Sequence, residues 1–329
     1  MKVKQNDIEV SVVCIAYNQE KYIAKMLESL LAQKTTFNYE ILIHDDASKD
    51  KTQDIIRKYQ KKYPETIKPI LQTENQFSKG NNPNIMFNYP RVMGKYVAFC
   101  EGDDYWSDSN KLQLQYEALQ KHTDCAICVH NTQCVSNTGE RINRSFPPVN
   151  IKGGVITAQE YIKMELCSIG WLFQTSSYFI RTEVIKKYVE EYNNVYPVGD
   201  LPLVLFSLHK GECYYIPISM SCYRTNSGGV MTNLQDVTRK IGHLKKMIAG
   251  HENFDKFTDY QYHADFQYAI QNYTFEILYL QGEYKRLLKF EHRQIFKQQS
   301  NKRKAIIFIG TLSPQIAKYI LRKKGKKNE

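Results

Sequence analysis

Long hydrophobic runs are missing from this sequence of 329 residues. Every apolar run is shorter than the roughly 20 residues that a transmembrane helix needs. Residues 1–9 are polar and charged and lack the apolar core of a secretory signal. Internal repeats and low-complexity segments are lacking as well. We therefore expect a globular, cytoplasmic protein, and its apolar share of 42% is sufficient for a sizeable core.

A complete zinc-binding pattern is also absent, although the chain has eight cysteines. Cys125 and Cys128 form a CxxC pair with His130 and Cys134 nearby, but a second CxxC or HxxxH pair is missing. The alternation of residues 125–131 favours a strand. Because most of the cysteines lie inside apolar runs, we expect reduced, buried thiols.

Acidic residues are outnumbered, which gives a net charge of +11, and much of the excess lies at the C-terminus. Residues 302–329 contain nine Lys or Arg and one acid, so the remainder is only mildly basic. Without interleaved basic and aromatic residues, charge alone is weak support for nucleic-acid binding, and we expect no nucleic-acid partner. Residues 305–310 and 316–321 are apolar and flanked by basic residues, a pattern typical of a helix on an anionic membrane surface. We expect residues 302–329 to bind the inner face of the cell membrane; a solvated, charged terminus with a docked helix is the alternative.

Strand and helix patterns alternate along the first part of the chain. Expected strands cover residues 10–16, 39–44, 67–71, 96–100 and 125–131, and expected helices cover residues 20–33, 51–63, 111–121 and 158–164. Residues 171–181 read as a further strand with a polar interruption. Alternation with short links predicts an α/β fold with a mostly parallel central sheet flanked by helices.

From about residue 234 the pattern changes to long amphipathic helices, which predicts a helical C-terminal region. We expect a catalytic domain over residues 1–230, a helical subdomain over 231–300 and a basic tail over 301–329. The boundary should lie near residues 229–233.

An abrupt change from apolar to acidic residues occurs within residues 94–108, GKYVAFCEGDDYWSD. Glu101, Asp103 and Asp104 follow a buried strand, where three carboxylates repel one another and lose hydration. A divalent ion such as Mg²⁺ or Mn²⁺ would offset that cost, and Gly102 permits the tight turn that brings the carboxylates together. The alternative is an acidic loop before the next helix, and for Asp108 we predict such an N-cap role.

Polar residues also follow the other expected strands. Tyr17 and Asn18 come after the first strand, and Asp45 and Asp46 come after the second. Because ligands of such sheets bind beyond the carboxyl ends of the strands, we expect these residues to share one rim with the acidic turn. Ser48 is the expected N-cap of the helix over residues 51–63.

Four segments in this order resemble the family 2 glycosyltransferases with the GT-A fold. They are VSVVCIAYNQEKYI at 10–23, YEILIHDDASKDKT at 39–52, GKYVAFCEGDDYWSDSNKLQLQ at 94–115 and VGDLPLVLFSLHKGECYYIPISMSCYR at 198–224. The resemblance covers about the first 230 residues, and the C-terminal helices lie outside it.

The resemblance implies a nucleotide-sugar donor, with UDP as the expected nucleotide, and a Mn²⁺ or Mg²⁺ ion. The implied donor-site residues are Ala16, Tyr17, Asn18, Glu20, Asp45, Asp46, Glu101, Gly102, Asp103 and Arg224. Residues 74–84 depart from the family pattern, which has an Arg-Asn pair there, and Lys79 is the residue we expect to supply the positive charge instead. Glu101-Gly102-Asp103 occupies the position of the family's DxD motif, with Glu in place of the first Asp. Because Glu is one methylene longer, Asp103 is ranked above Glu101 as a direct metal ligand, and Asp104 is the third expected ligand. The family's histidine near the last loop is replaced here by Asn226 or Ser227, which leaves the third metal ligand open.

The resemblance also places a catalytic carboxylate at Asp200, which would accept the proton of the acceptor hydroxyl in an inverting displacement. The alternative is that Asp200 only caps the helix over residues 202–209, and the two roles are compatible. On the acceptor side we expect His130, Trp171, Gln174, Thr175 and Ser176. For His130 a satisfied strand-end histidine is an equally good interpretation.

The sequence therefore predicts a metal-dependent inverting transferase. It would move a hexosyl or N-acetylhexosaminyl group onto a glycan or lipid-linked acceptor in cell-surface polysaccharide synthesis. The alternative is an inactive scaffold of the same fold at the membrane surface.

Overall fold

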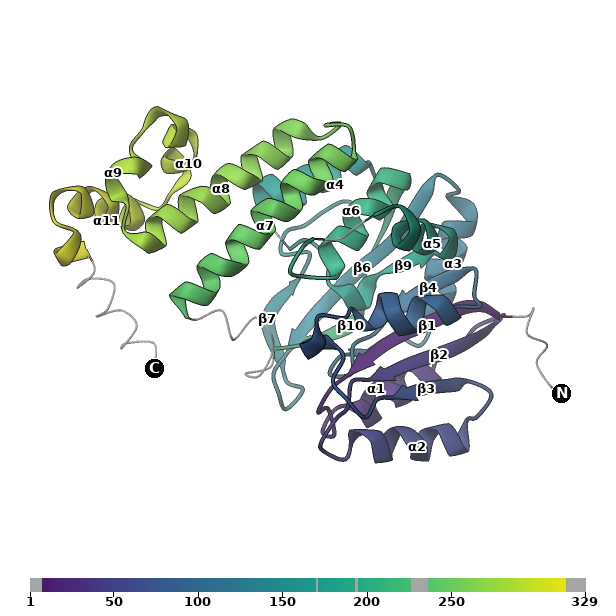
Figure 1. The fold of residues 1–329 in the computed structure, drawn as a ribbon. Coiled ribbons are helices and arrows are strands. Elements are labelled where there is room, and N and C mark those ends of the chain that lie inside the picture. Colours follow the sequence, from purple (N-terminus) through teal and green to yellow (C-terminus); the bar gives the residue numbers. More distant parts are fainter. Residues whose placement is uncertain (1–7, 170, 193–194, 226–235, 318–329) are drawn as a thin grey trace. The chain divides into compact units, whose positions relative to one another are not determined.

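The computed structural model describes residues 8–169, 171–192, 195–225 and 236–317, and the chain forms two compact units (Figure 1). Unit 1 contains residues 1–193 and 198–227, and unit 2 contains residues 194–197 and 228–329. The boundary expected at residues 229–233 lies outside the described residues.

Unit 1 is built on a sheet in which the described residues form ten strands. The strands are β1 (Ile8–Ala16), β2 (Asn38–Asp45), β3 (Ile67–Leu71), β4 (Tyr96–Phe99), β5 (Tyr105–Trp106), β6 (Cys125–Val135), β7 (Arg141–Phe146), β8 (Gly154–Ile156), β9 (Phe179–Arg181) and β10 (Glu212–Arg224). Their order is β3-β2-β1-β4-β9-β6-β10-β5, with β7 beside β6 and β8 beside β10. The sheet is mixed: β3, β2, β1 and β4 are parallel, β9 is antiparallel to both of its neighbours, and β6 and β10 are parallel.

Six α-helices accompany the sheet in the described part of unit 1. They are α1 (Ile23–Leu31), α2 (Thr52–Lys62), α3 (Lys111–Lys121), α4 (Ala158–Lys163), α5 (Thr182–Glu191) and α6 (Asp200–Lys210). Shorter helical turns are η2 (Phe77–Lys79), η3 (Asn84–Asn88), η4 (Tyr89–Arg91), η5 (Met164–Ile169) and η6 (Thr175–Ser177). The predicted α/β class is confirmed.

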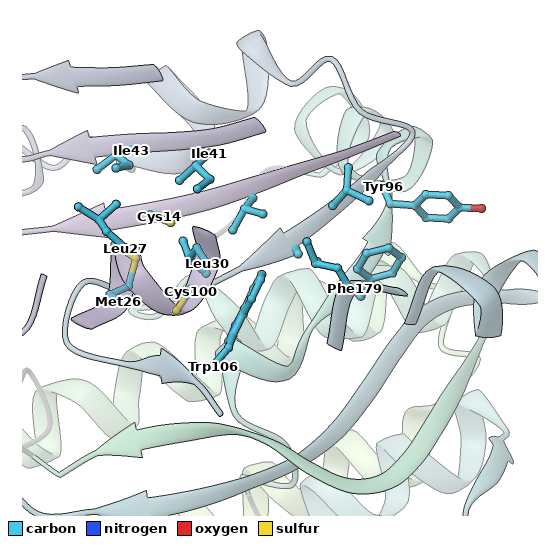
Figure 2. Packing of buried hydrophobic residues seen from close by; sticks show 14 of the residues in the cluster. Cys14, Met26, Leu27, Leu30, Ile41, Ile43, Tyr96, Cys100, Trp106 and Phe179 are labelled. Carbon is cyan, nitrogen blue, oxygen red and sulfur yellow. The ribbon is translucent and has the colours of Figure 1, made fainter. Parts of the chain in front are cut away.

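A hydrophobic core joins the first helices to one face of the sheet. Ile23, Met26, Leu27 and Leu30 of α1 follow helical spacing and are fully buried. They belong to the same buried cluster as Cys14 and Ile43 of the sheet, and Figure 2 shows Met26 and Leu27 beside Cys14. This packing fixes the ends of β1 and β2 relative to α1.

Two predicted helix caps are wrong. The N-cap position of α2 is Lys51 rather than Ser48, because the Ser48 hydroxyl donates to Asp45 at 2.5 Å. The N-cap position of α3 is Asn110 rather than Asp108, whose carboxylate accepts the Asn110 N–H at 2.8 Å. In both places the polar side chain takes part in the turn before the helix instead of capping the helix itself.

The strand expected over residues 171–181 is present only as β9. Residues 175–177 form the turn η6 instead, in which the Ser177 hydroxyl donates to the Gln174 carbonyl oxygen at 2.7 Å. Local hydrogen bonds of small polar side chains replace the strand pairing there.

Unit 2 contains the helical region predicted after the sheet. Its helices are α7 (Val237–Phe257), α8 (His263–Gln281), α9 (Tyr284–Leu287), η8 (Phe290–His292), α10 (Arg293–Gln298) and α11 (Asn301–Leu312). Ile306 and Ile307 of α11 share a buried cluster with Phe275, Leu287 and Ile295. The start of the basic tail is therefore part of the core of this unit.

None of the helices in the described part of the chain has both the length and the hydropathy required to cross a membrane.

Candidate active site

The carboxyl ends of β1, β2 and β4 lie at one edge of the sheet. Ala16, the last residue of β1, is the register partner of Asp45, the last residue of β2. The turn after β4 returns to the end of β1, where the Gly102 N–H donates to the Ile15 carbonyl oxygen at 2.9 Å. A Cβ atom on Gly102 would lie 3.1 Å from both Ile15 O and the Cβ of Ala16. A small residue at position 102 therefore lets the acidic turn pack directly on β1.

The three carboxylates of this turn have different surroundings. Glu101 is exposed, Asp103 is half-buried and Asp104 is 1% exposed. One Asp104 oxygen accepts the Arg224 N–H at 2.9 Å, and the other is buried without a hydrogen bond among the described residues. Burial, followed by the charges of Asp103 and Glu101, raises the pKa of Asp104 well above its ordinary value. Ionisation of Asp104 is therefore disfavoured in the folded protein.

Asp200 begins α6 and is half-buried. One of its oxygens accepts the Leu201 N–H at 2.9 Å, and the Thr175 hydroxyl also donates to its carboxylate. Burial outweighs these two bonds and raises the pKa of Asp200 above its ordinary value.

The pKa of Glu101 depends on charges both within the acidic turn and at Asp200. Protein atoms around the Glu101 carboxylate, together with the negative charges of Asp103 and Asp200, raise the pKa of Glu101. A carboxylate responds in this way only to charges nearby, because water and salt screen distant ones. The charge of Asp200 is thus close enough to the acidic turn to act on Glu101.

A ready-made metal centre is absent from the described residues, where no three His, Cys, Asp or Glu side chains are grouped to hold an ion. Asp104 is buried and accepts the Arg224 N–H, whereas Glu101 is exposed and Asp103 is half-buried. Two carboxylates completed by substrate phosphates are a usual Mg²⁺ arrangement. The ligand set of Glu101, Asp103 and Asp104 stays a prediction, with Asp104 the weakest member.

Both aspartates expected at the nucleotide are buried and hydrogen-bonded to protein groups. Asp45 accepts from the Ser48 N–H at 3.0 Å and from the Gln53 amide at 2.6 Å. Asp46 accepts from the main-chain N–H groups of Gln76 and Phe77, at 2.7 and 3.1 Å. These carboxylates order the loops around the expected nucleotide position, and their contact with a base stays a prediction.

The loop after β1 is tied to the loop after β2. Asn18 has a φ of 54°, and its side-chain oxygen accepts the Lys49 N–H at 2.8 Å. Glu20 accepts the Lys51 N–H at 3.1 Å. Tyr17 lies directly before Asn18 and is 43% exposed, so its ring is available to a ligand.

The two cations expected at the donor phosphates are engaged by the protein. Lys79 forms an ion pair with Glu74. Arg224 is 4% exposed, and its guanidinium group donates to the carbonyl oxygens of Asp103, Ser136 and Asn137 at 3.0, 2.9 and 3.0 Å. Arg224 therefore joins the acidic turn to the β6–β7 connection.

The expected acceptor residues divide by burial. His130, Gln174 and Ser176 are at most 1% exposed, so the acceptor prediction now rests on Trp171 and Thr175. Trp171 is half-buried and packs against the rings of Phe146 and Tyr223. Thr175 is half-buried and donates to Asp200.

Sequence reasoning missed Glu165 of η5. Its carboxylate accepts the Leu172 N–H at 2.8 Å, and burial and the charge of Asp200 raise its pKa to about 8. No motif marks Glu165 in the sequence. It lies 35 positions before Asp200, and only the fold brings the two residues near each other.

Comparison with known proteins places this geometry in context. A family model described as "Glycosyl transferase family 2" matches residues 11–188. TuaG of Bacillus subtilis, named as a candidate teichuronic acid biosynthesis glycosyltransferase, is 30% identical over 135 residues, which cover 41% of this chain and 51% of TuaG. Uncharacterized mycobacterial relatives, including one from Mycobacterium bovis, are 32% identical over 236 residues, and the matched region spans 63% of their length.

Solved structures share the fold at low identity. Residues 1–349 of TarS from S. aureus, in complex with UDP-GlcNAc, superpose with a TM-score of 0.60 at 15% identity, covering 98% of this chain and 93% of that one. A mannosyltransferase from Pyrobaculum calidifontis, in complex with GDP-Man and Mn²⁺, gives 0.54 at 12% identity, covering 92% and 79%. These likenesses confirm the predicted fold.

Proposed function

Because the chain belongs to glycosyl transferase family 2, we propose that it transfers a sugar, with inversion, from a UDP-sugar to a hydroxyl group of a glycan or lipid-linked acceptor. The expected setting is cell-surface polysaccharide synthesis, the role that the name of TuaG carries. The observation that supports the proposal is that the negative charges of Asp103 and Asp200 both contribute to raising the pKa of Glu101, as expected if Asp200 lies near the acidic turn.

In the proposed reaction the acceptor oxygen attacks the anomeric carbon of the donor sugar. The hydroxyl proton passes to the Asp200 carboxylate, the bond from the anomeric carbon to the diphosphate oxygen breaks, and the nucleoside diphosphate departs with the bonding electrons. The Thr175 hydroxyl and the Leu201 N–H orient the Asp200 carboxylate, since both donate to it. Its raised pKa makes Asp200 a stronger base than an exposed aspartate.

Glu101 and Asp103 are the residues proposed to hold a Mn²⁺ or Mg²⁺ ion. The charges of Asp103 and Asp200 contribute to raising the pKa of Glu101, and such repulsion between neighbouring carboxylates supports a divalent cation at this turn. When bound, such an ion neutralises charge on the departing diphosphate.

The apolar and basic surface of unit 2 supports the proposed contact with the inner face of the membrane. A cavity is lined by Leu287, Leu288, Phe290, Arg293 and Phe296, and Phe290 is 87% exposed. Phe308 and Leu312 of α11 are 52% and 88% exposed. Exposed apolar side chains near lysines and arginines are suited to an anionic bilayer surface.

Release of UDP from a panel of UDP-sugars, with and without Mn²⁺, tests the proposal. Turnover with at least one donor, lost in EDTA, is the expected result. Full turnover in EDTA would reject the metal. If no donor is turned over with or without Mn²⁺, an inactive scaffold of the same fold is the better description of the protein.

A further inference from the structure

A cavity of about 360 Å³ lies next to the acidic turn, and none of the six residues that line it is acidic. The lining residues are Lys21, Tyr22, Lys25, Asn137, Thr138 and Arg224. They come from the start of α1, the β6–β7 connection and the end of β10. Three of the six are cations.

Arg224 is fixed within this cavity without losing its charge. Its guanidinium group donates to neutral carbonyl oxygens, two of them on the β6–β7 connection. Its Cζ atom lies 4.4 Å from the centre of the Tyr22 ring. An arginine held by neutral partners is pre-organised for an anion, because little conformational entropy remains to be lost.

Lys25 approaches the same point from α1. Its Nζ atom lies 3.7 Å from the centre of the Tyr105 ring, an interaction that also leaves the charge intact. A Cβ atom on Gly139 would lie 3.7 Å from Lys25 Nζ and 3.9 Å from Arg224 Nη1. The φ of 91° at Gly139 favours glycine, so the turn keeps the space between the two cations free of a side chain.

Lysine and arginine side chains that converge on one cavity are a common arrangement for binding a phosphate group. The donor diphosphate has its own predicted position at Glu101 and Asp103, where a metal would hold it. The cavity lining has no carboxylate for a metal, so an anion there would pair directly with Lys21, Lys25 and Arg224.

We propose that this cavity binds a phosphate group carried by the acceptor glycan, a second anion distinct from the donor diphosphate. The inference rests on the proposed transferase function and narrows its acceptor to glycans that contain phosphate. Arg224 then borders both sites, since its main-chain N–H binds Asp104 and its side chain lines the cavity.

The test is calorimetric titration of the full chain with a soluble glycerol-phosphate oligomer, in the presence of saturating UDP. Replacing both lysines, in Lys21→Gln/Lys25→Gln, should weaken binding by about tenfold or more, because each removes a charge-assisted hydrogen bond. The matched control is Lys58→Gln/Lys61→Gln on the exposed face of α2, which makes the same charge change and should bind like the parent. Affinity for UDP should be the same in all three proteins.

Three outcomes would overturn the inference. They are equal weakening in both double variants, displacement of the oligomer by UDP, and a lysine-dependent affinity for phosphatidylglycerol vesicles without affinity for the oligomer. UDP displacement would assign the cavity to the donor, and vesicle binding would assign it to the membrane. Donor hydrolysis does not require the cavity. Measuring it in the same proteins therefore tests the transferase proposal independently of the phosphate-binding inference.

Discussion

Asp200 combines a half-buried carboxylate with two donors that keep it oriented, and its protonation should set the acid limit of the reaction. Asp200→Asn preserves the size of the side chain and the oxygen that accepts from Leu201. We expect transfer to fall by on the order of 10²- to 10⁴-fold, the usual contribution of a general base. UDP affinity should not change. Near-native transfer by the variant would mean that another group is the base.

The pH dependence of the parent protein follows from the raised pKa of Asp200. The base must be ionised, so transfer should be lost as the pH falls through a midpoint above the ordinary aspartate value of 3.8. Thr175→Val removes a hydrogen bond that lowers this pKa, and the midpoint should therefore move to higher pH. The measurement is kcat/KM against pH for both proteins. An unmoved midpoint would show that another group sets the limit.

The ionised side chain of Glu101, a proposed metal ligand, should reduce the stability of the metal-free protein at neutral pH. Because its pKa in the folded protein is raised, the ionised form is disfavoured by folding above the ordinary value of 4.5. Glu101→Gln should raise the melting temperature at pH 8 by about 1–2 °C, given the size of the chain. The gain should shrink towards zero near pH 5, where the parent carboxyl is largely protonated when folded. Thermal unfolding without metal at both pH values tests this, and a gain that is independent of pH would contradict it.

At the scale of elements, the packing of the acidic turn on β1 depends on Gly102. A methyl group there would press on Ile15 O and the Ala16 Cβ at 3.1 Å, and the backbone oxygen has little freedom to yield. Gly102→Ala should cost on the order of 1–3 kcal/mol of stability through overpacking. Displacement of Glu101 and Asp103 should lower transfer by on the order of 10- to 10²-fold.

Gly242→Ala is the control for this substitution. Its Cβ would meet nothing within 4 Å, and it lies inside α7, where alanine is the better helix former. Its activity should match the parent and its stability should not fall. A Gly102→Ala protein with parental activity would show that the turn adjusts without moving its carboxylates.

At the scale of the whole molecule, the proposed membrane contact can be tested without damage to a core. Removal of residues 302–329 would also delete Ile306 and Ile307, which are buried in unit 2. Phe290→Ser/Leu312→Ser changes only side chains that are 87% and 88% exposed. We expect the fraction of the protein that sediments with phosphatidylglycerol vesicles to fall several-fold. Burial of each of these apolar side chains in the bilayer interface contributes about 1.5–3 kcal/mol of binding free energy.

Phe77→Ser supplies the matched control for the vesicle experiment. Phe77 is 61% exposed and belongs to unit 1, away from the basic tail in sequence. Its vesicle binding should equal that of the parent. Equal loss in both variants would point to a general effect of surface hydrophobicity, and no loss in either would reject the membrane surface on unit 2.

The sequence by itself determined the first strands and helices of unit 1 and the order of their polar ends. The bounds of β3 and α3 agree with the sequence patterns, since local periodicity and flanking Pro or turn residues define such elements. It also placed the acidic turn directly after a buried strand. Parallel strands bring such ends to one edge regardless of the details of packing.

Only the tertiary structure decided where individual side chains point and which groups they contact. The Asp104 carboxylate accepts the main-chain N–H of Arg224, and Glu165 lies near Asp200. These partners depend on strand register and loop paths that join distant residues, which local patterns do not encode. The cationic cavity arises in the same way, because its three segments meet only when β10 is paired with β6.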